Sequence, residues 1–296
     1  MPPQQQLFPD EVARFRARYK ARGLTPDVIA AFQDIIKQHY ATRGRKFPFR
    51  EPAHYGDPYK VLVSEVMLQQ TQADRVVEKY LAFVKAFPDF NALAAASNEA
   101  VLKAWVGLGY NRRALALKRI AEVIISTYGG KLPSSVEELD KFPSIGPNTA
   151  ASIATFAFNT AIPFIETNIR TVFLHFFFDG NPSIKDDAIL DIVAKTLDKM
   201  NPREWYYALM DYGVLLKKAG NNSIKLDAKN KNSTRFKGSD REVRGKILRS
   251  VLDSPKNLVE IAKDVAEAEA RVSRLLALLE KEGFIAREGP RFIIKR

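Results

Sequence analysis

The chain has 296 residues, with 46 Lys and Arg against 34 Asp and Glu, and no Cys. This length exceeds that of most single domains, so we expect one large or two moderate domains. The absence of Cys excludes disulfides, thiol nucleophiles and thiolate metal sites. The net charge of +12 favours a polyanionic partner, nucleic acid before membrane, because the sequence contains no apolar run of membrane-spanning length and no signal-peptide core.

The excess of basic residues lies mainly toward the C-terminus. Residues 217–296 contain 20 basic and 11 acidic side chains, a net charge of +9. Residues 219–238 are rich in Asn, Lys, Ser and Gly, which is typical of a solvated connector. We therefore predict a core over residues 1–217, a basic linker over 218–238 and a second domain over 239–296.

Apolar spacing is helical through most of the first 217 residues. A stripe from Val28 to Ile36 follows Thr25-Pro26, and Asp57-Pro58 is typical of a helix start. The further predicted helices span residues 58–68, 71–88, 97–108, 112–128, 135–142, 149–158, 168–178, 185–200 and 202–217. This series with short connections predicts an all-α core.

The C-terminal region has a different pattern. Predicted helices at 240–252, 258–265 and 269–282 precede two short apolar strands on either side of Glu288-Gly289-Pro290. Three helices and a hairpin predict a small α+β domain that is winged-helix-like. Such a domain either binds DNA or packs against other protein without DNA contact.

A tight turn joins two of the predicted helices between Leu139 and Ala151. Its sequence, Pro143-Ser144-Ile145-Gly146, is typical of a helix-hairpin-helix motif. Backbone N–H groups and the helix dipole at the start of the second helix favour a phosphate. The alternative is a plain corner between two helices.

A single carboxylate lies in an otherwise apolar helical segment. We expect partial desolvation to raise the pKa of Glu65, which would make it a general acid near neutral pH. The alternative is a glutamate that faces solvent or is capped by the next helix. Gln69, Gln70 and Thr71 follow directly, and amides at a helix end can fill a base stack or read base edges.

These segments, followed in order by Gly107-Leu108-Gly109-Tyr110 and residues 166–172, resemble the endonuclease III and MutY group of helix-hairpin-helix DNA glycosylases. The resemblance covers residues 25–216, and residues 65–72 most resemble the MutY branch, which releases adenine. It implies a two-lobed helical core that flips a base out of duplex DNA and hydrolyses its N-glycosidic bond in base excision repair.

The resemblance also implies roles for individual residues. Glu65 protonates the departing base, and Glu166, where the family has Asp, stabilises positive charge on the sugar. Alternatively, Glu166 caps the helix that follows it. Asn148 and Tyr207 line the base pocket. The residues expected to contact DNA are Gln69, Gln70, Thr71, Tyr110, Ser144, Ile145, Gly146, Thr149, Asn168, Arg271 and Arg274.

The chain departs from the family at several positions. Tyr110 either wedges beside the opposing base or is a core residue beside Trp105. Asn148 stands where lyase-active relatives have Lys, so we expect no Schiff base and a monofunctional enzyme. The four cluster cysteines of the family are absent, so we expect no iron–sulfur cluster and no other cofactor. The histidines lack metal-ligand spacing and predict no metal site: His39, His54 and His175.

The base that is released stays open at this point. Tyr207 stands where the adenine-releasing branch has Gln, and the C-terminal pattern differs from that branch's 8-oxoguanine-reading domain. We expect adenine opposite 8-oxoguanine or guanine, with uracil or thymine opposite guanine as the alternative. A non-catalytic DNA-binding damage sensor is a further hypothesis. The expected partner is double-stranded DNA with a mismatched or damaged base, bound by a monomer without membrane contact in a prokaryotic cytoplasm.

Overall fold

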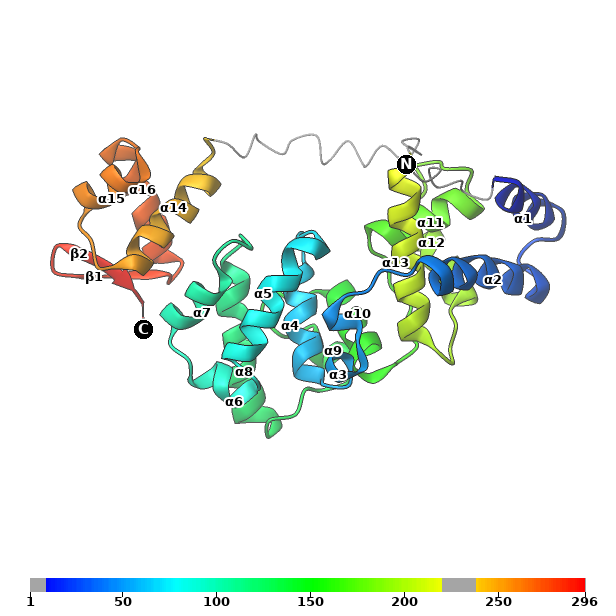
Figure 1. The fold of residues 1–296 in the computed structure, drawn as a ribbon, viewed down its shortest axis with the longest axis horizontal. Helices are drawn as coiled ribbons and strands as arrows, with labels where there is room; N and C mark the ends of the chain where they lie inside the picture. The colour runs from blue at the N-terminus through cyan, green and yellow to red at the C-terminus, as the bar shows by residue number, and fades with distance from the viewer. Residues whose placement is uncertain (1–8, 220–237, 296) are drawn as a thin grey trace. The chain divides into compact units, whose positions relative to one another are not determined.

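The structure, a computed structural model, describes residues 9–219 and 238–295. Within these ranges the chain forms sixteen α-helices, one 3-10 helix and one two-stranded sheet (Figure 1). The all-α core and the small α+β C-terminal part predicted from the sequence are therefore confirmed. Most of the predicted linker, residues 220–237, lies outside the described residues.

The described residues group into two compact units. Helix α4 (Pro58–Leu68) begins in the first unit and ends in the second. The other elements of the first unit are α1 (Pro9–Arg22), α2 (Pro26–Arg43), η1 (Pro48–Arg50), α3 (Pro52–Tyr55), α9 (Val136–Leu139), α10 (Pro147–Phe158), α11 (Thr167–Phe177), α12 (Asp186–Thr196) and α13 (Pro202–Lys218).

The second unit contains the turn at residues 141–145 and two sets of elements. These elements are α5 (Ala73–Ala86), α6 (Phe90–Ala95), α7 (Asn98–Trp105), α8 (Arg112–Tyr128), α14 (Asp240–Asp253), α15 (Leu258–Val265), α16 (Glu269–Lys281), β1 (Ile285–Glu288) and β2 (Arg291–Ile294). The strands pair antiparallel with Ile285 opposite Ile294, so the predicted hairpin is confirmed.

The core of the first unit is built from aromatic side chains. Phe32 of α2 makes edge-to-face contacts with Phe173 and Phe176 of α11 and with Trp205 of α13, at ring-centroid distances of 5.1 to 5.6 Å. Such pairs add about 0.5–1.5 kcal/mol each to the free energy of burial. Helices α2 and α11 both pack against α13 (Figure 1), and this packing fixes the start of α11, where Glu166 lies.

Some predicted helix ends are wrong. The helix predicted over 185–200 ends at Thr196, because the Asp198 carboxylate accepts hydrogen bonds from the N–H groups of Met200 and Asn201 and folds a turn there. The helix predicted over 135–142 is the short α9, and the chain then enters the turn at residues 141–145. Helices α1, α3 and α6 and the 3-10 helix η1 were not predicted.

Candidate functional site

Glu65 lies on α4 between buried apolar neighbours. Val63, Val66 and Met67 are each at most 1% exposed, whereas Glu65 is partly buried. Partial burial agrees with the desolvation that the sequence predicts and contradicts a fully solvent-facing glutamate. The raised pKa and the role as general acid stay predictions.

The turn after α4 brings two predicted DNA-contacting segments together. The Gln69 amide Nε2 donates to the Ser144 carbonyl at 3.0 Å, which joins this turn to the hairpin 75 residues later. Gln70 is exposed and has a left-handed backbone with φ of 53°, a conformation that non-glycine residues rarely adopt. Strained backbone of this kind is often found at ligand-contacting loops.

The predicted hairpin joins α9 to α10 through a similarly strained residue. Ser144, which stands in place of a family glycine, has φ of 64°. Ile145 is buried and its N–H donates to the Phe142 carbonyl, and contact of the hairpin backbone with a phosphate stays a prediction. Gly146 is the N-cap of α10, Asn148 is exposed and Thr149 is partly exposed.

A buried arginine that sequence reasoning missed ties these loops together. Nη1 of Arg113 donates to the carbonyls of Val66, Met67 and Gln69 at 2.7 to 2.9 Å. Its Nη2 donates to Thr71 Oγ1 at 3.1 Å and to the carbonyl of Gly109 at 3.3 Å. The guanidinium thus satisfies the last carbonyls of α4 and holds the Gly107–Tyr110 loop.

The surroundings of Arg113 explain its charge state and the place of Tyr110. Burial lowers the pKa of the Arg113 guanidinium to about 10, so it stays charged at neutral pH. The Tyr110 ring lies 5.4 Å from this guanidinium and is 45% exposed, with φ of 47°. Tyr110 is therefore not the core residue considered as an alternative; Trp105, which is fully buried, occupies the core instead.

Glu166 caps α11 as one sequence interpretation predicts. Its Oε1 accepts from the N–H groups of Asn168 and Ile169 at 2.7 and 2.8 Å, and its Oε2 accepts from the Asn168 amide at 3.1 Å. Burial raises the pKa of the Glu166 carboxyl, against the opposing effect of these hydrogen bonds and of the Lys217 ammonium. A cap and a charge-stabilising role are compatible, because a capping carboxylate is anionic.

A second buried ionic cluster lies beside Tyr207. The Asp211 carboxylate, 1% exposed, accepts from the backbone and guanidinium of Arg45 and from Arg50 at 2.6 to 3.0 Å. The Arg50 guanidinium lies 4.5 Å over the ring of Tyr207, which stacks on Phe156 at 4.8 Å. Tyr207 is therefore buried between Arg50 and Phe156, and its contact with a base stays a prediction.

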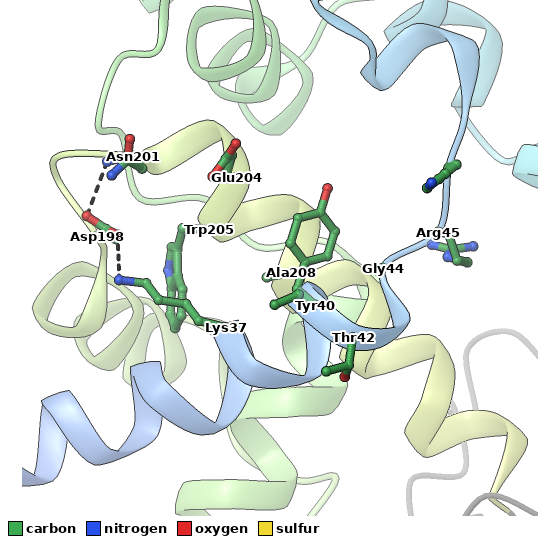
Figure 2. Close-up of a pocket in the computed structure, with 12 residues that line it drawn as sticks. Lys37, Tyr40, Thr42, Gly44, Arg45, Asp198, Asn201, Glu204, Trp205 and Ala208 are labelled. Atoms are coloured by element: carbon green, nitrogen blue, oxygen red, sulfur yellow. Dashed lines mark hydrogen bonds and ion pairs between the residues drawn. The ribbon is translucent and has the colours of Figure 1, made fainter.

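An open cavity of about 750 Å³ lies on the first unit between α2 and α13. The Lys37 ammonium binds Asp198 at 2.8 Å, and both residues line this cavity together with Trp205 (Figure 2). None of the residues predicted for the site lines this cavity.

The predicted DNA contacts of the C-terminal part have partners within the chain. Arg271 binds Asp240 and Glu267, each at 2.9 Å, and Arg274 binds Asp240 at 2.7 Å. Their contact with phosphate stays a prediction, but it requires these ion pairs to be shared or exchanged. Among residues 9–219 and 238–295 we find no cluster of His, Asp and Glu suited to a metal ion and no helix long and apolar enough to cross a membrane.

Comparison with known proteins gives a consistent result. Residues 63–196 match the HhH-GPD superfamily of base excision DNA repair proteins. An adenine DNA glycosylase of Mycobacterium tuberculosis (strain H37Rv) is 34% identical over 229 residues, which cover 71% of this chain and 74% of that protein. One of Mycolicibacterium smegmatis is 35% identical over 241 residues, with coverage of 75% and 80%. A solved structure of a thermostable thymine-DNA glycosylase is similar with a TM-score of 0.57 and 26% identity, covering 62% of this chain and 85% of that one.

Proposed function

Because the chain belongs to the HhH-GPD superfamily of base excision DNA repair proteins and is a DNA glycosylase, we propose that the base it releases is adenine opposite 8-oxoguanine or guanine. The similarity to two adenine DNA glycosylases across about three quarters or more of their length carries this proposal. The partly buried Glu65 on the apolar helix α4 supports it, because adenine must be protonated to leave as a neutral molecule.

The proposed reaction uses the two carboxyl groups in different protonation states. The Glu65 carboxylic acid donates its proton to the flipped base as the bond between that base and C1′ of the sugar breaks. The anionic Glu166 stabilises the positive charge that develops on the sugar. Water then adds to C1′ and loses a proton, which leaves a free base and an abasic site.

Two expected absences are part of the proposal. Asn148 offers an amide where a Schiff base needs an amine, so the product is an intact strand with an abasic site. The chain has no cysteine thiolates, so its donor set does not fit the iron–sulfur cluster of related enzymes, and the proposed reaction proceeds without it.

Thymine opposite guanine is the second candidate. The thymine-DNA glycosylase of known structure supports it, as does Tyr207 in place of the Gln expected in the adenine-releasing branch. Thymine lacks the basic ring nitrogens that adenine offers to an acid, so this candidate makes less use of Glu65 as a proton donor.

A panel of duplexes tests both candidates. We expect release of adenine opposite 8-oxoguanine, detected by alkaline cleavage of the abasic product, to exceed release of thymine, uracil or hypoxanthine. Glu65→Gln should lower the single-turnover rate by about 100-fold or more. Glu99→Gln, which changes an exposed glutamate, serves as the control. An unchanged rate in Glu65→Gln would contradict the proposed role of Glu65. Absence of base release from every duplex would contradict the whole mechanism and favour a non-catalytic damage sensor.

A further inference from the structure

A chain of hydrogen bonds connects the candidate catalytic carboxylate to a lysine on another helix. Nζ of Lys217, near the end of α13, donates to Asn168 Oδ1 at 2.6 Å, and Asn168 Nδ2 donates to Glu166 Oε2 at 3.1 Å. An ammonium can only donate and a carboxylate can only accept. The amide of Asn168 therefore has one orientation that satisfies both neighbours, and Lys217 fixes it.

A glycine one turn before Lys217 makes this connection possible. Gly213 and Lys217 are four residues apart and share a face of α13. A Cβ atom built on Gly213 would lie 2.4 Å from the carbonyl oxygen of Asn168 and 2.7 Å from its Cβ. Only glycine lets the start of α11 approach α13 this closely. The close approach brings Asn168 within reach of the Lys217 ammonium.

The charges of Glu166 and Lys217, at the two ends of this series of hydrogen bonds, affect each other. Burial raises the pKa of Glu166, and the Lys217 ammonium lowers it; burial lowers the pKa of Lys217, and Glu166 raises it. Three further charged groups on the helices that pack against α11 have partners of their own. These are Arg16 of α1 with His175, Asp186 of α12 with Arg170, and Asp211 of α13 with Arg45 and Arg50.

We propose that Lys217 is a positioning residue of the glycosylase reaction: through Asn168 it holds the Glu166 carboxylate anionic and in one orientation for the developing sugar cation. This proposal rests on the proposed function for the role of Glu166, but the contacts themselves do not. An anion that is partly removed from water and lacks a compensating charge takes up a proton more readily. Lys217 supplies that charge without contacting Glu166 directly, so the carboxylate keeps its hydrogen bonds to the start of α11.

The pH dependence of base release tests the proposal in the full-length protein. Activity needs anionic Glu166, so it falls as the pH drops through the pKa of this group. This fall is the acidic limb of the plot of rate against pH. Lys217→Met should move the acidic limb to higher pH by about 0.5 to 1 unit in single-turnover assays with enzyme in excess. Lys217→Arg should restore the limb. Lys218→Met, which removes the same charge at the next residue, should leave the limb in place.

A second measurement does not depend on activity. The ¹³C resonance of the Glu166 carboxyl, in protein labelled with ¹³C-glutamate and assigned with Glu166→Gln, reports its pKa directly. We expect the same upward shift in Lys217→Met and none in Lys218→Met. An unshifted resonance and an unshifted limb in Lys217→Met overturn the proposal. A shifted resonance in Lys217→Met, together with a native protein that releases no base from any duplex, would support the contact and reject the proposed function.

Discussion

At the scale of the residue, Arg113 connects the parts of the site that sequence motifs present separately. The motifs drew attention to Glu65, Gln69 and Tyr110 because of their position and polarity. Arg113 follows a second arginine at the start of α8, and nothing in this local pattern distinguishes the buried side chain from the exposed one. Its role depends on carbonyl groups of α4 that come close only in the fold, and such partners cannot be predicted from spacing along the chain.

Replacing Arg113 separates its role from that of its neighbour. Arg113→Met leaves the last carbonyls of α4 without their donor, so we expect the free energy of unfolding to fall by roughly 3 kcal/mol. Arg112→Met, at an exposed position, should change it by less than about 0.5 kcal/mol. Urea unfolding followed by tryptophan fluorescence measures both. Equal effects of the two substitutions would show that the Arg113 contacts do not stabilise the fold.

At the scale of the element, helix α1 is attached to α11 through an ionisable contact. Arg16 donates both to the carbonyl of His175 and to its ring Nδ1, the latter at 3.2 Å. An arginine has no acceptor, so Nδ1 must be unprotonated. Burial, with a contribution from Arg16, lowers the pKa of His175 to about 4.

This contact makes stability depend on pH. The pKa of His175 is lower in the folded state than its ordinary 6.5, so the unfolded chain binds more protons in this range. The contribution of His175 to the free energy of unfolding is therefore fully present above pH 6.5 and is lost as the pH falls from 6.5 to about 4. It amounts to about 1–2 kcal/mol after allowance for partial exposure. His175→Gln should flatten this part of the curve, measured by urea midpoints at each pH. A native curve with no slope there would contradict the assignment.

Some helices and side-chain clusters could be predicted from the sequence and others could not. The start of α2, which has a long apolar stripe, and both ends of α8, which is followed by Gly129-Gly130, were predicted. Helix α1 was missed because its three core contacts, Val12, Phe15 and Tyr19, stand among charged residues. The two candidate carboxylates were identified by motif, whereas the Arg45–Asp211–Arg50 cluster needed long-range contacts to appear.

At the scale of the whole molecule, several basic side chains of the C-terminal region are neutralised by acidic partners within the fold. Arg244 binds Glu282 and Lys256 binds Asp264, in addition to the ion pairs of Arg271 and Arg274. Charges in such pairs contribute less to phosphate binding than the count of 20 basic side chains in residues 217–296 suggests, because binding must first exchange their partners.

Deletion of residues 239–296 tests the contribution of this region to DNA binding. We expect weaker affinity for duplex DNA and a salt dependence whose slope, log K against log salt, is smaller in magnitude by roughly 1 to 3. Fluorescence anisotropy at several salt concentrations measures both, with Arg274→Met in the full chain as a milder variant. An unchanged affinity and slope would instead support a packing domain without DNA contact.

The left-handed residues Gln70, Tyr110 and Ser144 affect the free-energy cost of each encounter with DNA during a search for damage. A repair enzyme meets a very large number of normal base pairs for each damaged one. Holding these side chains in uncommon backbone conformations costs of order 1–3 kcal/mol each, and the chain meets that cost once, when it folds. Each later encounter with DNA begins with these loops already ordered, so the penalty does not recur during the search.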